Sequence, residues 1–327
     1  MTEPLLSITD LSAVSDRENG ASILRDVGLT LERGEVRGLV GERGAGKSTI
    51  AKALLGILPR TVRVTSGAIR FEGKNLLTIP QRELRDIMGS EISLIPQDPQ
   101  TALNPGRRIE AQLTDGLRMR RSLSVREAHV RALKLLEEVH IRDPERVLRA
   151  YPHELSGGMR QRVMIAMALA CEPRLLIADE PTTALDVTIQ AQILDLMREL
   201  KSRLGSAIVL ITHDLGVVAE MAQRVVVMYA GRKVEEAPVA ELFARPRHPY
   251  TRGLLDSMPK LGRRAHQLVE IPGTVPSLIG EAAGCAFAAR CAFASQRCRE
   301  ELPPFEADSA GHGVACWHSE RVIRAVA

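Results

Sequence analysis

The sequence predicts an α/β fold with a mainly parallel β-sheet. Apolar runs at residues 36–40, 175–178 and 207–211 have the length and near-continuous hydrophobicity of strands that are buried on both faces. A polar motif follows each run directly, so each predicted strand carries one motif at its carboxyl end. We therefore expect a sheet that positions several polar groups of different chemistry.

The first run leads into Gly41-Glu-Arg-Gly-Ala-Gly-Lys47-Ser48-Thr49, which matches a phosphate-binding loop. Glycines let the backbone amides curl around phosphate oxygens, and the following helix, expected at residues 48–55, offers its positive N-terminal end. Lys47 is expected to hold the β and γ phosphates, and Ser48 to place its hydroxyl on Mg²⁺. By chance the pattern arises in roughly one chain in a hundred of this length, so alone it could be a glycine-rich turn. The residues expected to contact nucleotide here are Gly41, Arg43, Gly44, Gly46, Lys47, Ser48 and Thr49.

Acidic and histidine side chains follow the next two runs and meet separate needs of phosphoryl transfer. Asp179 is expected to orient Mg²⁺ through its water, and Glu180 to polarise the attacking water. Taken alone, this acidic pair could simply cap Pro181. His213 could touch the γ phosphate and hold Glu180, although a single histidine after a strand is usually structural. The order of the motifs along the chain favours catalytic roles for Lys47, Glu180 and His213.

Leu155-Ser-Gly-Gly-Met159 resembles the signature motif of ATP-binding cassette (ABC) ATPases, with Met159 where glutamine is commoner. Simple P-loop GTPases and kinases lack this motif. Ser156 is a plausible N-cap, and Gly157 and Gly158 expose amides at the start of a helix expected at residues 159–170. The resemblance implies a P-loop NTPase of the ABC nucleotide-binding type with a helical subdomain. It also implies that this motif faces ATP held by a second subunit, so that hydrolysis requires a dimer.

The same resemblance assigns roles to two loop residues. Asp186, in Ala184-Leu-Asp, resembles the loop that crosses the dimer interface. Gln97, after a strand expected at residues 91–95, resembles the residue that senses Mg²⁺ and links the core to the transport channel. Both assignments rest on order and spacing, because loop side chains are normally solvated. The implied magnesium ligands are Ser48, Gln97 and Asp179.

Composition favours a large soluble protein. Of the 327 residues, 45% are apolar, which is enough to fill the cores of two domains. We find no apolar run near the roughly 20 residues needed to cross a bilayer, and we expect no cleaved leader. The net charge of +4 and the aromatic content of 3% give no sign of a nucleic-acid stacking surface, so no nucleic-acid partner is expected.

The motifs predict a nucleotide-binding domain over residues 1–240, with a helical subdomain at about 98–168, and a C-terminal extension over residues 241–327. The clearest helix of the subdomain is expected at residues 126–139. Its predicted apolar face consists of Val130, Leu133, Leu136 and Val139. Residues 224–228 and 233–236 flank Ala230-Gly231 and are expected to form a hairpin.

The extension contains His248-Pro-Tyr250 and four of the five cysteines, Cys285, Cys291, Cys298 and Cys316. This pattern resembles the C-terminal extension of peptide and nickel importer ATPases, closest to the D-type subunit of dipeptide and oligopeptide importers. The resemblance implies a peripheral subunit on the cytoplasmic face of the bacterial membrane. Its implied partners are an F-type second ATPase, two permeases and a periplasmic or extracellular binding protein. Peptide is the default cargo, with nickel, glutathione, opines or sugars as alternatives.

Four cysteines spaced C-x5-C-x6-C-x17-C have three physical interpretations. Two disulfides are disfavoured in a reducing cytosol. Zinc usually takes tighter spacings, although His312 or His318 could replace a thiolate. Four thiolates on a loop-rich scaffold also suit an iron–sulfur cluster, and the resemblance implies a [4Fe-4S] centre, which we favour over zinc. Cys171, on the signature helix, is expected to be core packing.

Two departures from the ABC pattern concern the nucleotide. The resemblance expects an aromatic residue near Ser15 to stack on adenine, but no aromatic residue precedes Phe71, which predicts weaker ATP binding. Arg43 stands where serine or asparagine is usual, and it could face solvent or reach a phosphate.

The alternative to a transporter subunit is a non-transport ABC ATPase that acts on ribosomes or DNA. Paired cassettes or long heptad coiled coils, which those proteins carry, do not fit this chain.

Overall fold

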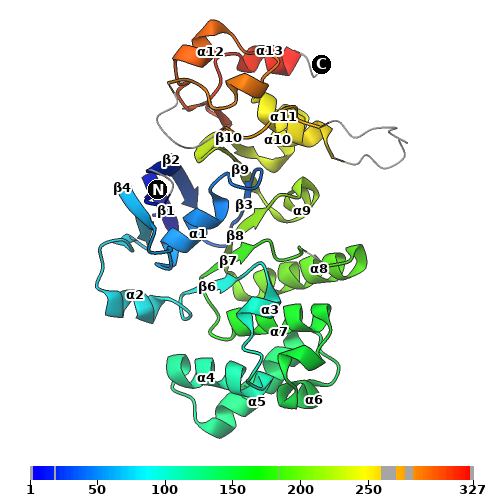
Figure 1. Cartoon of the computed structure of the whole chain (residues 1–327). Helices are drawn as coiled ribbons and strands as arrows, with labels where there is room; N and C mark the ends of the chain where they lie inside the picture. Colours follow the sequence, from blue (N-terminus) through cyan, green and yellow to red (C-terminus); the bar gives the residue numbers. More distant parts are fainter. Residues whose placement is uncertain (1–2, 18–19, 184, 259–269, 277–282, 325–327) are drawn as a thin grey trace. The chain divides into compact units, whose positions relative to one another are not determined.

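The computed structural model describes residues 3–17, 20–183, 185–258, 270–276 and 283–324 (Figure 1). It contains two compact units. The first unit comprises the chain up to Leu31, Val36–Leu77 and the chain from Ile211 onward, and the second comprises Glu32–Glu35 and Thr78–Leu210. The chain therefore leaves the first unit twice, briefly at Glu32–Glu35 and again from Thr78 to Leu210.

An antiparallel sheet in the first unit has the strand order β2-β1-β4-β5. Its strands are β1 (Leu6–Ser15), β2 (Ala21–Leu31), β4 (Val62–Phe71) and β5 (Lys74–Asn75). Buried and more exposed side chains alternate along much of β1, which is the pattern of a strand packed on one face. The register shifts between Ile8 and Leu11, where Asp10 has a positive φ of 48°, so the sheet is locally irregular there.

The remaining strands of the first unit follow the order β11-β12-β10-β9-β3. They are β3 (Val36–Val40), β9 (Arg224–Tyr229), β10 (Arg232–Pro238), β11 (Glu306–Ala307) and β12 (Gly313–Val314). β3 is buried throughout and pairs in parallel with β9, as its continuous apolar run predicts. β9 and β10 form the predicted hairpin, and the φ angles of 46° at Ala230 and 78° at Gly231 suit a tight primed turn.

The first unit also contains short helices. These are α1 (Lys47–Leu54), α9 (Leu215–Met221), α10 (Val239–Ala244), α11 (Pro249–Asp256), η2 (Ala288–Arg290), α12 (Gln296–Glu300) and α13 (Ser319–Arg324). α1 confirms the helix expected after the phosphate-binding loop. It ends before Gly56, whose φ of 68° is left-handed and cannot continue a helix.

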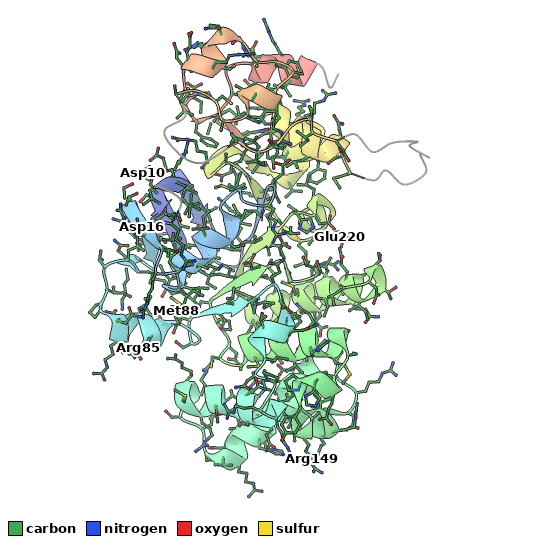
Figure 2. All side chains as sticks on the ribbon, viewed as in Figure 1. Asp10, Asp16, Arg85, Met88, Arg149 and Glu220 are labelled. Carbon is green, nitrogen blue, oxygen red and sulfur yellow. The ribbon has the colours of Figure 1, made fainter. Side chains whose placement is uncertain are left out.

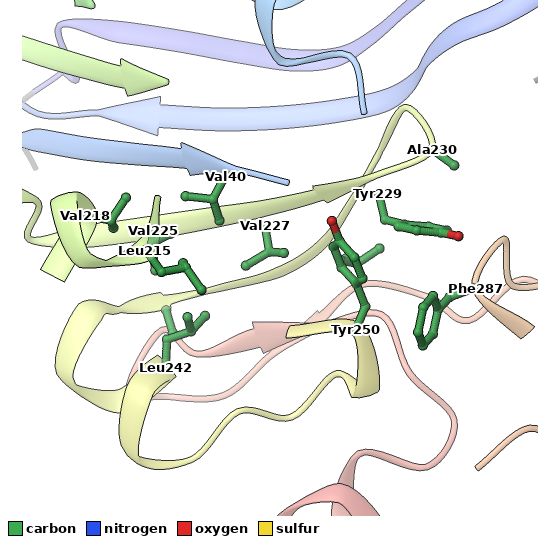
Figure 3. Close-up of a cluster of buried hydrophobic side chains, with 12 residues drawn as sticks. Val40, Leu215, Val218, Val225, Val227, Tyr229, Ala230, Leu242, Tyr250 and Phe287 are labelled. Atoms are coloured by element: carbon green, nitrogen blue, oxygen red, sulfur yellow. The ribbon is translucent and has the colours of Figure 1, made fainter. Parts of the chain in front are cut away.

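The hydrophobic core of the first unit joins the sheet to segments near the C-terminus (Figure 3). Three of the chain's few aromatic side chains meet there. The Tyr229 ring centroid lies 4.7 Å from that of Tyr250 and 5.2 Å from that of Phe287, the latter pair edge to face. Val40, the last residue of β3, belongs to the same cluster. Packing therefore connects the strand before the phosphate-binding loop to residues 250 and 287.

The second unit combines parallel strands with most of the long helices. Its strands are β6 (Ile92–Ile95), β7 (Leu175–Asp179) and the first residues of β8 (Ala207–Thr212). Its helices are α2 (Gln81–Ile87), α3 (Pro99–Ala102), α4 (Ile109–Arg121), α5 (Val125–Glu138), α6 (Pro144–Arg149), η1 (Pro152–Glu154), α7 (Gly157–Leu169) and α8 (Val187–Leu204). β6 and β7 pair in parallel, which confirms two of the predicted strands.

Helix α5 has the predicted bounds to within one residue, but the predicted apolar face was partly wrong. Val130 is 58% exposed and Leu133 is half-buried. The buried positions of α5 are Ala128, Ala132, Leu135 and Leu136, and Val139 is buried directly after the helix. Because an α-helix has 3.6 residues per turn, positions three apart drift around its axis. A strict three-residue repeat therefore leaves the buried face after one or two turns.

Charged side chains lie mainly on the surface. Figure 2 shows Arg149 pointing away from the ribbon at the end of α6, and its ion pair with Glu145 is largely exposed. Such pairs contribute little to stability, which agrees with a solvated basic surface. Among the described residues, none of the helices combines the length and apolar character needed to span a membrane.

Candidate functional site

The phosphate-binding loop connects β3 to α1 and depends on its glycines. Gly41, Gly44 and Gly46 all have positive φ angles, of 150°, 86° and 97°. A Cβ at Gly41 would lie 2.2 Å from the Met228 carbonyl oxygen, and one at Gly46 would lie 2.7 Å from Leu24 Cδ2. The loop backbone is thus pressed against its neighbours, and only glycine fits at these positions.

Lys47 lies at the start of α1 and is only 6% exposed. Its Nζ donates to the carbonyl oxygens of Gly41, at 2.7 Å, and Glu42, at 3.0 Å. No side chain caps the N-terminus of α1. Ser48 and Thr49 follow in the first turn, so the amide end of α1 and the Lys47 ammonium flank the same loop. This combination suits phosphate oxygens. Arg43 is exposed, as in the solvent-facing alternative.

Glu180 lies directly after β7 and adopts a φ of 48°, which is unusual for a residue with a side chain. Gln97 Nε2 donates to its carboxylate at 2.9 Å, and Thr183 Oγ1 donates to the same oxygen at 2.8 Å. The buried Gln161 side chain donates to the Pro181 carbonyl oxygen at 2.5 Å and fixes the turn. Asp179 is the last residue of β7 and is half-buried. The structure therefore brings together two predicted site residues, Gln97 and Glu180.

His213 belongs to the first unit, where it follows β8 and is exposed. Asp214, beside it, caps α9 by accepting hydrogen bonds from the Gly216 and Val217 amides. The backbone amide of Asp214 donates to Thr212 Oγ1 at 3.0 Å. The loop that carries His213 is thus fixed on both sides, and the predicted contact of His213 with Glu180 stays a prediction.

The signature segment has the geometry of a capped helix start. Ser156 is the N-cap of α7, and its Oγ accepts from the Met159 amide at 3.3 Å. A Cβ at Gly158 would lie 3.2 Å from Ile189 Cγ2, whereas Gly157 has open space around its Cα. Asp186 likewise caps α8, accepting from the Ile189 amide at 3.0 Å. Ser156 and Asp186 therefore both begin helices in the second unit. Ala184 lies outside the described residues.

The position expected to hold an aromatic residue has a different environment. Ser15 is the last residue of β1 and is only 6% exposed. It pairs with Ala21 and Val62 on the neighbouring strands. Phe71 is itself buried in β4. Phe71 therefore offers no exposed ring to adenine, and the weaker ATP binding expected from the sequence stays a prediction.

Four cysteines, Cys285, Cys291, Cys298 and Cys316, line a single narrow pocket near the C-terminus. All four are free thiols, so the disulfide interpretation finds no counterpart in the structure. The Phe293 amide donates to Cys291 Sγ at 3.3 Å, and the His318 amide donates to Cys316 Sγ at 3.4 Å. Burial raises the pKa of Cys316 to about 12 and also raises the pKa of Cys285 and Cys291. The raised pKa values favour the neutral thiol at Cys285, Cys291 and Cys316.

His312 and His318 are the two histidines that could replace a cysteine ligand in a zinc site. His312 is 1% exposed, and its Nε2 lies 2.8 Å from a carboxylate oxygen of Glu235, outside the cysteine pocket. His312, one of the two possible substitutes, is therefore not placed to replace a cysteine ligand, because it does not line the pocket and its Nε2 faces the buried Glu235 carboxylate. His318 does line the pocket. Within the described ranges, no three His, Cys, Asp or Glu side chains are spaced to hold a metal ion.

Cys171 is 5% exposed just beyond the C-terminal end of α7, which confirms its predicted role in packing. Its carbonyl oxygen accepts a hydrogen bond from Arg121 at the end of α4.

Three residues near the phosphate-binding loop were not predicted from the sequence. Glu42, Tyr250 and Arg290 join this loop to the C-terminal region through hydrogen bonds. The His-Pro-Tyr motif was the available signal, but nothing in the sequence pairs it with a loop more than 200 residues earlier.

Comparisons with known proteins agree with this geometry. Residues 24–183 match the ABC transporter family. A dimeric post-hydrolysis structure of the ATP-binding cassette MJ0796, bound to ADP and Pi, is 26% identical. It covers 72% of this chain and 98% of that chain with a TM-score of 0.64. A probable peptide ABC transporter ATP-binding protein of Sinorhizobium fredii is 51% identical over 322 residues, 98% of this chain and 96% of the relative. The chain belongs to the ABC transporter family, and it has the nucleotide-binding fold of its ATPases.

A second match places the chain more narrowly within that family. Residues 234–298 match the oligopeptide/dipeptide transporter C-terminal region. The oligopeptide transport ATP-binding protein OppD of Salmonella typhimurium is 45% identical over 314 residues, which cover 96% of this chain and 93% of OppD. The chain is thus an ABC ATPase of the branch that carries this C-terminal region.

Proposed function

We propose that this chain hydrolyses ATP to drive the import of dipeptides and oligopeptides through a membrane complex. The match of residues 234–298 to the oligopeptide/dipeptide transporter C-terminal region is the observation that carries the choice of cargo. The names of the relatives in Sinorhizobium fredii and Salmonella typhimurium point the same way. Nickel, glutathione and other solutes are competing cargoes for the same ATPase.

In the proposed mechanism, Lys47 binds the β and γ phosphates, and Ser48, Gln97 and Asp179 would hold Mg²⁺, which would supply positive charge to neutralise the phosphates. Glu180 orients the attacking water, and the hydrogen bonds from Gln97 and Thr183 support its carboxylate. His213 supports the γ phosphate. Apart from Gln97, which lies in the loop after β6, these groups stand at or directly after the end of a strand or in the first turn of a helix.

We further propose that two cassettes sandwich the nucleotides. Ser156 is exposed at the start of α7, where its hydroxyl and the amides of Gly157 and Gly158 could reach a phosphate from outside. Val187, next to Asp186, is 84% exposed and is therefore accessible to a partner cassette. The partner cassette is proposed to be an F-type subunit, and the pair is proposed to lie under two permeases on the cytoplasmic face of the membrane. A binding protein would deliver the peptide.

We propose that residues 1–240 form the cassette, with its helical subdomain at about 98–168, and that residues 241–327 form a small cysteine-rich extension. We propose that this extension holds a [4Fe-4S] cluster. The proposal is supported by four cysteines, one buried and three partly buried, that line one pocket, and by backbone amides that donate to two of the sulfurs. Such a group would hold the extension together. Zinc, with His318 near the thiols, is the alternative.

Co-expression with neighbouring permease, ATPase and binding-protein genes tests the transport proposal. We reconstitute the purified complex into liposomes and consider the complexes whose ATPases face the vesicle lumen. We expect these liposomes to accumulate a labelled dipeptide only when ATP is enclosed in the lumen. Unlabelled peptides should compete and Ni²⁺ should not. Competition by Ni²⁺ alone, or co-purification with ribosomes or DNA in place of permeases, would overturn the proposal.

Anaerobic purification with iron, sulfide and zinc analysis tests the cysteine site. We expect iron and sulfide near four per chain, and their loss in Cys285→Ser. Cys171→Ser is the matched control, because Cys171 lies outside the pocket, and it should keep its iron. Zinc in place of iron, or iron unchanged in Cys285→Ser, would contradict the cluster.

A further inference from the structure

Glu42, the second residue of the phosphate-binding loop, is held from two sides by the C-terminal region. Its backbone amide donates to the Tyr250 hydroxyl at 2.7 Å. Its carboxylate accepts two hydrogen bonds from Arg290, from Nη1 at 2.8 Å and from Nη2 at 3.1 Å, one on each oxygen. A bidentate pair of this kind fixes orientation as well as distance.

The burial of these contacts makes them strong. Tyr250 is fully buried, and the Arg290 side chain is 6% exposed against 26% for Glu42. The bond to Glu42 is the main reason that the pKa of Arg290 is raised. Arg290 also donates to the carbonyl oxygens of Ile271 and Pro272 and to the Tyr229 hydroxyl. The guanidinium is therefore a fixed point rather than a mobile surface group.

Tyr250 is held just as firmly. His248 caps α11 through its Nδ1, which accepts from the Tyr250 amide at 3.1 Å, and Pro249 occupies the first helical position. The Tyr250 ring packs against the rings of Tyr229 and Phe287, as Figure 3 shows. The His-Pro-Tyr motif thus positions one hydroxyl group against the loop.

These contacts bear directly on the phosphate-binding lysine. The Glu42 carbonyl oxygen accepts a hydrogen bond from Lys47 Nζ, while the Glu42 amide is held by Tyr250. Both peptide groups next to the Glu42 Cα are therefore tied, one to the C-terminal region and one to Lys47. A movement of Glu42 would change the position from which Lys47 meets a phosphate.

We propose that Tyr250 and Arg290 are positioning residues of the nucleotide site, through which the C-terminal region sets the affinity for nucleotide. They keep the loop in the conformation that accepts phosphates, so ATP does not have to order the loop when it binds. A loop that is ordered only part of the time binds with an affinity reduced by that fraction. The proposal rests on the ATP-binding role of the loop.

The first test measures the dissociation constant of a fluorescent ADP analogue for the purified full chain. For Arg290→Lys, which keeps the charge but loses the bidentate bond, and for Tyr250→Phe, which loses only the hydroxyl, we expect affinity to fall about 3- to 30-fold. The ATP KM should rise by a larger factor than kcat falls. The matched control is Arg252→Lys, which alters the ion pair with Asp256 on α11 and should bind ADP like the wild type.

A double-mutant cycle between Glu42→Gln and Arg290→Lys separates positioning from general destabilisation. Both changes break the same bidentate bond between Glu42 and Arg290, so their effects on ADP affinity should be strongly non-additive. Additive effects, or wild-type affinity in folded Tyr250→Phe and Arg290→Lys, would overturn the inference. If the wild-type chain itself bound no ADP, the failure would lie with the ATP-binding role and not with these two residues.

Discussion

At the scale of single residues, Glu180 has an unusual backbone conformation, and its carboxylate accepts hydrogen bonds from two side chains. Its φ of 48° costs free energy for a residue with a side chain, and Gln97 and Thr183 hold the carboxylate that this backbone presents. Such strain is typical of a residue whose direction matters more than its contribution to stability. The amide of Gln97 also makes the carboxylate sensitive to anything that moves the loop after β6.

We predict that Glu180→Gln lowers ATP turnover roughly 10²- to 10⁴-fold and leaves ATP bound, because an amide cannot polarise the attacking water. Steady-state ATPase rates and nucleotide binding of the assembled complex measure the two effects. Glu199→Gln, at an exposed position paired with His140, is the control and should retain its rate. Near-normal turnover in Glu180→Gln would refute the role.

His248 predicts a dependence of stability on pH. Burial lowers its pKa from 6.5 to about 4, while the nearby Glu235 carboxylate acts in the opposite direction. In the folded chain its Nδ1 must stay unprotonated to cap α11. The unfolded chain binds this proton more readily, so the contribution of His248 is complete above pH 6.5 and is lost as the pH falls toward 4.

We expect the free energy of unfolding to fall by an amount on the order of 3 kcal/mol from this group across that range. Chemical unfolding at pH 7.5, 6, 5 and 4.5 measures it. Carboxylates titrate in the same window, so the comparison is with His248→Asn, whose amide oxygen can also cap a helix. Equal pH slopes for the two proteins would contradict the assignment.

At the scale of elements, helix α5 illustrates how local signals work. Ser124 caps it, and Glu127 completes a capping box: the Ser124 amide donates to the Glu127 carboxylate at 2.9 Å, and the Glu127 amide donates to Ser124 Oγ at 3.3 Å. The helix start is therefore fixed by neighbouring residues. The buried face of α5 is set instead by its packing against α4, α6 and α7. Local sequence does not determine how those helices pack.

We predict that Ser124→Ala lowers the free energy of unfolding by about 1 kcal/mol, because the Glu127 amide at the start of α5 loses its acceptor, the Ser124 hydroxyl. Thermal or urea unfolding measures the loss. Ser124→Asp should restore most of the stability, since aspartate is also a good cap. Failure of Ser124→Asp to recover more than Ser124→Ala would mean that the hydroxyl acts in another way.

At the scale of the whole molecule, Glu235 ties the first unit together. It is fully buried on β10 and accepts hydrogen bonds from the amides of Arg247, at 2.6 Å, and His248, at 3.0 Å. The His312 ring lies 2.8 Å from the same carboxylate. One side chain thus joins the sheet, the start of α11 and the segment before β12.

We predict that Glu235→Gln lowers the free energy of unfolding by about 2–4 kcal/mol, because the amide NH₂ group faces donors and leaves a buried group unpaired. Melting temperature and urea midpoints measure it. Glu241→Gln, at an exposed position on α10, should change stability by less than about 0.5 kcal/mol. A loss in Glu235→Gln no larger than in this control would contradict the network.

Much of the fold follows from short-range patterns. Continuous apolar runs predicted β3, β7 and β8, and the spacing of the glycines predicted the phosphate-binding loop. These features were predictable because they depend on residues that are neighbours in the sequence. Long-range contacts were not accessible in this way. The contact between His312 and Glu235 joins residues 77 positions apart, and the hydrogen bonds between Arg290 and Glu42 join residues 248 positions apart. A single sequence contains no signal that pairs such residues.

The distance along the chain between Glu42 and its partners also sets an order of events during synthesis. Tyr250 follows Glu42 by 208 residues and Arg290 follows it by 248 residues. A growing chain therefore exposes a complete phosphate-binding motif long before the groups that hold it have left the ribosome. Because domains form as the chain emerges, the motif made early becomes fully competent for nucleotide only when segments made late have folded onto it. Prematurely terminated chains would thus be poor competitors for ATP in the cell.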